Sequence, residues 1–189
     1  MEQKQEAFDL TDAFDTVAVA LSGGSASGCL LKLAADAVGA KNVVAITLQT
    51  ELTSKDELEL AAKMCDVAEV EHCVVSVDLL SDEKIAENGN DRCYLCKTRM
   101  INAIRHEAWL RGIEYILDGT NLDDSCDCKA GAQALSDNGV ICPFLMHHMT
   151  KSDISRLLGA DLPAHDKKYR CAALNIEKGT RITFDAIPE

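Results

Sequence analysis

The sequence predicts a single α/β domain in which a mostly parallel, five-stranded sheet is flanked by helices. Three observations support this prediction. Short β-rich runs alternate with stretches of helical period, no repeat or low-complexity linker interrupts them, and the 189 residues suit one ordinary domain. A hydrophobic content of 47% is enough for a proper core. We expect the core at about residues 14–160 and an irregular C-terminal tail at about 161–189.

The expected strands are short runs rich in β-branched and other apolar residues, at 16–21, 42–48, 73–78, 114–119 and 139–144. Apolar residues recur at three- and four-residue spacing in the predicted helices, at 26–38, 54–68, 93–112, 128–138 and 150–159. Ser54 with Glu57, and Thr150 with Asp153, form capping pairs at two helix starts. This alternation implies right-handed crossovers and ligands bound beyond the carboxyl ends of the strands.

Charge and hydropathy argue against two classes of partner. The formal charge is −12, from 19 basic and 31 acidic residues, and no local basic patch is present, so we expect no nucleic acid. The first 15 residues lack the pattern of a signal peptide, and no apolar run approaches the roughly 20 residues that span a bilayer. We therefore expect no membrane and a cytoplasmic location.

Nine cysteines are many for a reducing compartment, where metal, cluster or nucleophilic roles are more common than disulfides. Cys29 and Cys65 lie in helical patterns and Cys73 opens a strand. Free cysteine usually behaves as a small core residue, so we expect these three to be structural. The remaining cysteines carry the functional information.

Serine and glycine dominate the turn between the first strand and its helix, at Ser22, Gly23, Gly24, Ser25 and Ser27. Backbone N–H groups, hydroxyls and the positive end of a helix dipole together make an anion cradle. The turn is not a Walker loop, because no Gly-Lys-Ser/Thr follows, and its glycine spacing differs from the dinucleotide fingerprint. It predicts a phosphate site; a plain glycine turn is the alternative.

The segment SGGSAS resembles the S-G-G-x-D-S pyrophosphate loop of the PP-loop ATP pyrophosphatases. Within that superfamily, further segments fall in the order and spacing of the LarE-type sulfurtransferases: DRCYLCK (91–97), DGTNLDD (118–124), CPFLMHHMTKSDISRLLG (142–159) and YRCAAL (169–174). The resemblance covers nearly the whole chain and implies a Rossmann-like fold of the adenine nucleotide alpha hydrolase (HUP) type. Members of this family load sulfur onto pyridinium-3,5-biscarboxylic acid mononucleotide during assembly of the nickel-pincer cofactor of lactate racemase.

The resemblance implies a reaction in two stages. A substrate carboxylate attacks ATP and becomes an acyl adenylate, and a sulfur nucleophile then displaces AMP. It implies ATP and Mg²⁺ as cofactors, a carboxylated, nucleotide-like small molecule as substrate, and a homo-oligomeric protein. Cys171 matches the late cysteine that delivers sulfur in this family.

Residues just past the fourth predicted strand lie at the same ligand edge, namely Asp118, Thr120, Asn121 and Asp124. We expect them to contact magnesium or ribose hydroxyls; ordinary Asx-turn chemistry is the alternative. Lys97 and Lys129 are cations near the predicted pocket, and a pocket that receives polyphosphate needs some. We expect Lys97 to help stabilise the charge that develops on pyrophosphate.

The sequence departs from the family pattern at several positions. Ala26 stands where the loop aspartate is expected, Lys129-Ala130-Gly131 replaces Arg-Pro-Gly, and Asn175 replaces an arginine after the late cysteine. The family also tends to continue into a further C-terminal region. These departures favour an alternative, a non-catalytic relative that keeps the nucleotide cradle or the thiol site as a binding module.

Cys93 and Cys96 form C-x-x-C at the start of a predicted helix, where the helix dipole and Lys97 would lower a thiol pKa. A thioredoxin-like redox pair would need a strand leading straight into it, whereas a polar loop precedes it. A structural zinc site could add Cys126 and Cys128.

The third interpretation of the C-x-x-C is an iron–sulfur cluster. Three thiolates, from Cys93, Cys96 and Cys171, would hold a [4Fe-4S] cluster and leave one iron open for an extra sulfide. The resemblance supports this interpretation, because some relatives have a comparable cysteine trio. In single-cysteine members, the late cysteine gives up its own sulfur instead.

Overall fold

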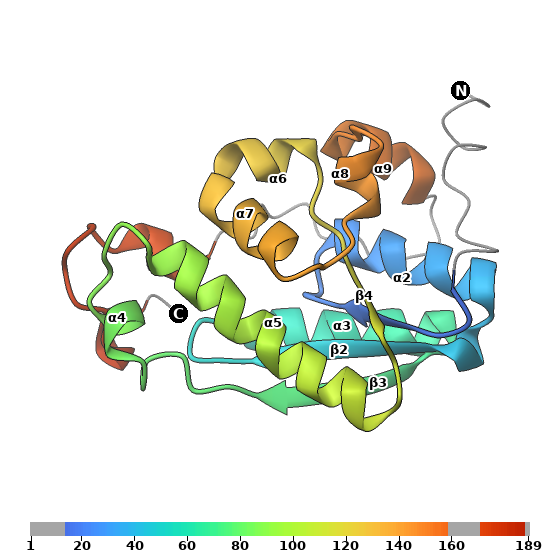
Figure 1. The fold of residues 1–189 in the computed structure, drawn as a ribbon, viewed down its shortest axis with the longest axis horizontal. Helices are drawn as coiled ribbons and strands as arrows, with labels where there is room; N and C mark the ends of the chain where they lie inside the picture. The colour runs from blue at the N-terminus through green and yellow to red at the C-terminus, as the bar shows by residue number, and fades with distance from the viewer. Residues whose placement is uncertain (1–13, 159–170, 188–189) are drawn as a thin grey trace.

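Four parallel strands form the sheet of the computed structural model, which describes residues 14–158 and 171–187 (Figure 1). Their order is β3-β2-β1-β4, with bounds β1 Val17–Ala20, β2 Val43–Gln49, β3 Glu71–Ser76 and β4 Tyr115–Asp118. In register, Val17 of β1 lies opposite Val43 of β2 and Tyr115 of β4. The predicted α/β class and parallel sheet are confirmed.

The prediction of a fifth strand at 139–144 is wrong for the described sheet. Only Ile141 forms a bridge with β4: its N–H donates to Ile116 O at 3.0 Å, and its carbonyl accepts from Asp118 N–H at 2.9 Å. Pro143 has no N–H to donate and instead begins the short helix α8 (Pro143–Met146). The pairing therefore stops after one residue.

Helices connect and cover the strands. The longer ones are α2 (Ser25–Val38), α3 (Lys55–Ala68), α5 (Arg92–Leu110), α7 (Lys129–Asp137) and α9 (Lys151–Leu158). Shorter helices are α4 (Glu83–Ala86) and α6 (Leu122–Asp127), and 3₁₀ turns are η1 (Ala40–Asn42), η2 (Ala172–Asn175) and η3 (Phe184–Ala186). None of the described helices is both long and apolar enough to cross a membrane.

The sheet divides the core into two layers, because successive strand residues point to opposite faces. Val17 and Val19 pack with α2, α3 and α9, whereas Ala18 packs with α5 and α7. Figure 1 shows α5 on the viewer's side of the sheet and α3 on the far side. Cys29 and Cys65 are buried in the first layer, which confirms their structural role, and Cys73 is half-buried in β3.

Capping pairs begin two of these helices as predicted. The Ser54 hydroxyl accepts from Glu57 N–H at 3.3 Å while the Glu57 carboxylate accepts from Ser54 N–H at 2.8 Å, a complete capping box for α3. Thr150 and Asp153 make the same reciprocal bonds, at 3.0 and 3.2 Å, before α9. Both signals are local and were readable from sequence.

The order of the strands creates a switch point between β1 and β4. From β1 the chain builds β2 and β3 on one side and then places β4 on the other side. The connections that leave the carboxyl ends of β1 and β4 therefore diverge, and open α/β sheets bind ligands in that crevice. Residues 22–27 follow β1 here, and residues 119–121 follow β4.

Candidate functional site

The turn after β1 is held tightly against α3. Gly23 has a φ of 77°, a left-handed conformation that side chains rarely adopt, and a Cβ there would overlap the Glu57 carbonyl oxygen. Gly24, with an extended conformation, is the N-cap of α2, and a Cβ at this position would approach only the Ser22 hydroxyl, at 3.4 Å. The first glycine is thus required by the fold, whereas a methyl group at the second would make only one van der Waals contact.

Hydroxyl groups fix the shape of this turn. Ser27 Oγ donates to Gly24 O at 3.0 Å and accepts from Ser22 N–H at 3.2 Å, and the two serine hydroxyls lie 3.1 Å apart. The Gly28 N–H bonds to Gly24 O, which is the first backbone bond of α2. The amides before Gly28 are the helix N-terminal donors that characteristically lack an intrahelical acceptor. The turn therefore has the parts of an anion cradle.

No carboxylate accompanies these donors. Position 26 is Ala, and the first turn of α2 contains no acidic residue. Gly119, directly after β4, packs against this turn: a Cβ there would lie 2.9 Å from both Cα and N of Ser27. The start of α2 and the end of β4 are consequently in direct backbone contact.

Asp118 and Lys97 form an ion pair beside that contact. Lys97 Nζ lies 3.1 Å from Asp118 Oδ2, and Oδ1 accepts from Thr120 N–H at 2.9 Å and from its hydroxyl at 2.6 Å. Burial is the largest single influence and opposes both charges, but the partner charge and the hydrogen bonds together outweigh it: the pKa of Asp118 is lowered and the pKa of Lys97 is raised. Both groups stay charged at neutral pH, and α5 is tied to the sheet edge.

Thiols from three elements gather at the start of α5. Burial raises the pKa of Cys96 to about 12, and the nearby Cys171 and Cys93 thiols add to this shift. Cys128, the N-cap of α7, is exposed, but partial desolvation of its sulfur raises its pKa, and its interaction with Cys93 contributes. The structure thus brings together Cys93, Cys96, Cys128 and Cys171, which we call the thiol group.

The expectation of a lowered pKa is wrong for Cys96. Lys97 does favour the thiolate, as expected, but desolvation of the buried sulfur is the larger effect. Sequence shows the neighbouring charge and the helix start, whereas burial depends on what packs over them.

The structure argues against two of the interpretations of the C-x-x-C, the thioredoxin-like redox pair and the structural zinc site. The residues before Cys93 form a loop after α4 rather than a strand, so the thioredoxin-like arrangement is not present. Within residues 14–158 and 171–187, no three His, Cys, Asp or Glu side chains are placed to hold a single metal ion. Cys126 is exposed, and every cysteine is a free thiol. The zinc interpretation therefore lacks a preformed site.

Asn121 and Asp124 serve the local structure. The buried Asn121 caps α6: its Oδ1 accepts from Asp124 N–H at 3.1 Å and its Nδ2 donates to Asp124 Oδ2 at 2.6 Å. Asp124 Oδ1 also pairs with Lys151 at 2.6 Å. These contacts are the Asx-type chemistry weighed as the alternative role. Lys129 is exposed at the first position of α7.

Sequence reasoning missed two buried polar residues beside the thiol group, Asn88 and Arg92. Arg92 Nη2 donates to Cys93 Sγ at 3.2 Å, and Nη1 donates to Asn88 Oδ1 at 2.9 Å. The available signal was the position of Arg92 directly before the C-x-x-C. Asn88 gave no signal, because its role depends on a contact with residues 176–180.

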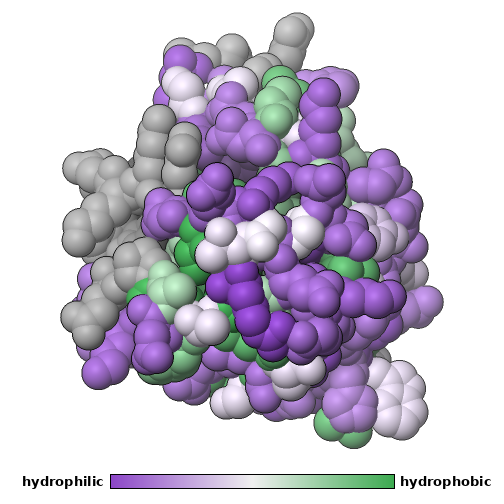
Figure 2. Space-filling model, turned by 90° about the vertical axis from the view of Figure 1, so that its left-hand side faces the viewer, coloured by the Kyte–Doolittle hydropathy of each residue, from purple (hydrophilic) through white to green (hydrophobic). Residues whose placement is uncertain are grey.

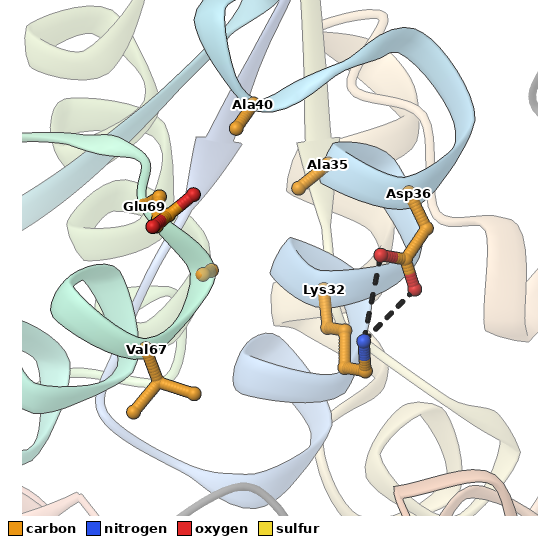
Figure 3. Close-up of a pocket in the computed structure, with 7 residues that line it drawn as sticks. Lys32, Ala35, Asp36, Ala40, Val67 and Glu69 are labelled. Carbon is orange, nitrogen blue, oxygen red and sulfur yellow. Dashed lines mark hydrogen bonds and ion pairs between the residues drawn. The ribbon is translucent and has the colours of Figure 1, made fainter.

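The end of the molecule that carries α4 and the start of α5 faces the viewer in Figure 2, where hydrophilic residues surround small apolar areas. A separate pocket lies between α2 and the C-terminal end of α3 (Figure 3). It is lined by Lys32, Ala35, Asp36, Ala40, Val67, Ala68 and Glu69. No residue of the serine-glycine turn or the thiol group lines it, so it is not part of the candidate site.

This fold, with a serine-glycine turn after its first strand, is similar to that of PP-loop domains. Residues 9–102 match the family described as NAD synthase. This match covers just under half of the chain and agrees with the predicted resemblance to the PP-loop superfamily.

Two curated relatives are similar to this chain over most of its length. It is 31% identical over 177 residues to the uncharacterized protein slr1717 of Synechocystis sp.. It is 29% identical over 177 residues to the pyridinium-3,5-bisthiocarboxylic acid mononucleotide synthase of Lactiplantibacillus plantarum. Each alignment covers 92% of this chain, but only 65% and 63% of the relatives. The chain thus spans about two thirds of their length.

Solved structures with the same fold include the U34-tRNA thiolase NcsA of Methanococcus maripaludis, determined with its [4Fe-4S] cluster. That structure has a TM-score of 0.67 at 17% identity, with 91% of this chain and 68% of the other covered. The NMN synthetase of Francisella tularensis has a TM-score of 0.65 at 17% identity, with 86% and 71% covered. At these identities the likeness confirms the fold.

Proposed function

We propose that this domain binds ATP at residues 22–27 and performs ATP-dependent sulfur transfer through the thiol group. One observation carries the proposal: a continuous series of contacts joins the loop to the thiols. Gly119 abuts Ser27, Asp118 pairs with Lys97, and Lys97 adjoins Cys96 on α5. The relative named as a bisthiocarboxylic acid mononucleotide synthase supports sulfur chemistry.

The two stages follow from the chemistry of carboxylates, which are poor electrophiles. A substrate carboxylate oxygen attacks the α-phosphorus of ATP, and the bond to pyrophosphate breaks. A sulfur nucleophile then attacks the acyl carbon, and AMP leaves to give a thiocarboxylate. In this proposal, the loop amides and the Lys97 ammonium stabilise the charge on departing pyrophosphate.

If Cys171 itself supplies the sulfur, its thiolate forms a thioester with the acyl carbon as AMP leaves. Loss of the Cα proton and cleavage of the Cβ–Sγ bond then release the thiocarboxylate and leave dehydroalanine at position 171. In the alternative route, Cys171 is a cluster ligand and a separate sulfide is transferred.

The donor set of the thiol group fits a [4Fe-4S] cluster, whose ligands are thiolates that each bind a different iron. Cys93, Cys96 and Cys171 would hold it, and a cluster bound in this way supplies an open iron that can carry the sulfur to be transferred. The NcsA structure, with its cluster, supports this assignment. Mg²⁺ fits less well, because Ala26 supplies no ligand and Asp118 is engaged by Lys97 and Thr120.

Three finer assignments belong to the same proposal. The substrate would be a carboxylated, nucleotide-like small molecule, as the name of the curated relative suggests. The reaction would serve nickel-pincer cofactor assembly, as the sequence resemblance implies. The protein would act in the cytoplasm, as a homo-oligomer.

Pyrophosphate release tests the nucleotide site. The purified chain is given ATP and pyridinium-3,5-biscarboxylic acid mononucleotide, and release is compared between wild type and Gly24→Ala. The added methyl meets only Ser22 Oγ, at 3.4 Å, so the fold should survive while the cradle is narrowed. Gly89→Ala is the matched control, with a similar nearest contact of 3.3 Å to Asp91. Equal release from wild type and Gly24→Ala would contradict nucleotide binding at the loop.

Anaerobic purification tests the thiol group. Cys171→Ser should abolish sulfur transfer and retain pyrophosphate release, whereas Cys126→Ser, an exposed control, should retain both. Sulfur transfer that survives Cys171→Ser would remove this cysteine from the reaction. If Cys93→Ala and Cys171→Ala both leave the iron content unchanged, the three-thiolate cluster is wrong.

A second candidate function is a non-catalytic binding module, which Ala26 favours because the loop has lost its expected carboxylate. This candidate predicts ATP binding by calorimetry without pyrophosphate release above background. Measuring ATP binding and pyrophosphate release together therefore distinguishes the two candidate functions.

A further inference from the structure

Arg92, the first residue of α5, is buried although it carries a charge, with 4% of its surface exposed. Among the described residues, no carboxylate lies within ion-pair distance of its guanidinium. It donates instead to Asn88 Oδ1 at 2.9 Å, to Ala173 O at 2.8 Å and to Cys93 Sγ at 3.2 Å. A buried charge with only neutral oxygen partners and a sulfur is costly, so this position calls for an explanation.

Asn88 extends the same connection. Its φ of 57° is left-handed, which Asn tolerates better than most residues. Its Nδ2 donates to Glu177 O at 2.9 Å and to Thr180 O at 3.1 Å, and its own carbonyl accepts from Gly179 N–H at 3.0 Å. Asn88 and Arg92 together hold the segment that follows Cys171 onto the loop between α4 and α5.

One guanidinium therefore connects Cys93 to the segment that carries Cys171. Cys93 is bonded directly, and Cys171 lies two residues before the bonded carbonyl of Ala173, which is itself buried. The two cysteines are far apart in sequence, and Cys171 is exposed at the start of η2. The hydrogen bonds of Arg92 connect Cys93 to the segment that follows Cys171.

We propose that Arg92 is a positioning residue that holds Cys171 beside Cys93 and Cys96. Its importance for activity rests on the sulfur transfer proposed above. The planar fork of arginine reaches acceptors in different directions at once, whereas a lysine ammonium on a flexible stem cannot hold all three. Arg92→Lys should therefore keep the charge and lose the positioning.

Dibromobimane, a bifunctional thiol reagent that fluoresces strongly after both arms react, measures the spacing directly. The reduced, metal-free full chain is treated, and peptide mapping identifies bridges from Cys171 to Cys93 or Cys96. We expect bridging to fall at least tenfold in Arg92→Lys and Arg92→Met, with single alkylation of Cys171 by iodoacetamide within twofold of wild type. Arg181→Met is the matched control.

Arg181 pairs with Glu83 and so ties the same C-terminal segment to α4, but it bonds to no cysteine in the described residues. In Arg181→Met, the amount of dibromobimane bridging from Cys171 to Cys93 or Cys96 should equal that of wild type. Unchanged bridging in a folded Arg92→Lys would overturn the inference.

If circular dichroism shows that neither Arg92 variant folds, a further variant, Asn88→Gly, tests the inference. Asn88→Gly keeps the left-handed backbone without strain and removes one acceptor of Arg92 together with the bonds to residues 177 and 180. Bridging should fall severalfold in Asn88→Gly, and unchanged bridging would again overturn the inference.

Kinetics separate this inference from the proposed function. Arg92→Lys should lower kcat for sulfur transfer on the order of 100-fold, the effect of misplacing a reacting group by about 1 Å, with KM for ATP unchanged. Sulfur transfer that is present but insensitive to Arg92→Lys would overturn the positioning role and leave the proposed function standing. Bridging that depends on Arg92 in a protein without sulfur transfer would overturn the function alone.

Discussion

The Lys97 ammonium lies 3.1 Å from the Asp118 carboxylate and joins the helix that carries Cys93 and Cys96 to the carboxyl edge of β4. Thr120 satisfies the other carboxylate oxygen with two hydrogen bonds. The pair fixes the start of α5 relative to the serine-glycine loop, so the spacing between this loop and the thiols depends on it.

Removing one partner of this pair should destabilise the fold. Lys97→Met leaves Asp118 buried without its counter-charge, and we expect a loss of about 2–4 kcal/mol in the free energy of unfolding; breaking a buried pair can cost more, but Lys97 is partly exposed. Urea denaturation measures the change. Lys32→Met is the control, because Lys32 and Asp36 form an exposed pair whose loss should cost under about 0.5 kcal/mol. Equal losses in the free energy of unfolding from Lys97→Met and Lys32→Met would contradict a structural role for the Lys97–Asp118 pair.

Acid should weaken the fold through Asp118. Its native pKa is lowered, whereas the unfolded value is about 3.9, so the carboxylate stabilises the fold above about pH 4. That contribution is lost as the pH falls through the lower native pKa. The stability difference between wild type and Asp118→Asn, measured by urea denaturation, should therefore shrink between about pH 5 and pH 2. A difference that stays constant over this range would refute the prediction.

Thiol reactivity should follow burial rather than motif. Four buried or half-buried thiols have a pKa raised to about 11 or 12, namely those of Cys29, Cys65, Cys96 and Cys142. In the reduced, metal-free protein at about pH 8, iodoacetamide should label the exposed Cys126 and Cys171 well before these four. Peptide mapping over time gives the order. Early labelling of Cys96 would mean that its C-x-x-C position outweighs its burial.

Restoring the loop carboxylate should raise turnover. Ala26→Asp adds an acid to the first turn of α2, where the helix dipole favours it by about 0.3–1 kcal/mol, and supplies the missing magnesium ligand. We expect faster, Mg²⁺-dependent pyrophosphate release and a slightly higher Tm. Ser152→Asp, in the first turn of α9, should gain stability only. If Ala26→Asp changes neither ATP binding nor turnover, nucleotide does not sit at this loop.

Much of the site's framework was predictable because its signals are local. The serine-glycine turn, the capping pairs of Ser54 and Thr150, and the helical start at Cys93 each depend on residues a few positions apart. The prediction of a fifth strand at 139–144 failed because an apolar run does not show whether a partner strand is aligned with it. Here Pro143 ends the pairing after Ile141.

The sequence by itself determined the alternation of strands and helices, the serine-glycine turn after the first strand and the presence of thiols in a C-x-x-C, because periodicity, turn residues and side-chain type are local properties. Only the tertiary structure decided that Lys97 meets Asp118, that Cys128 joins the thiol group, and that Arg92 connects Cys93 to the segment after Cys171. Burial and electrostatic coupling arise when distant segments exclude water from one another, and that exclusion exists only once the chain has packed.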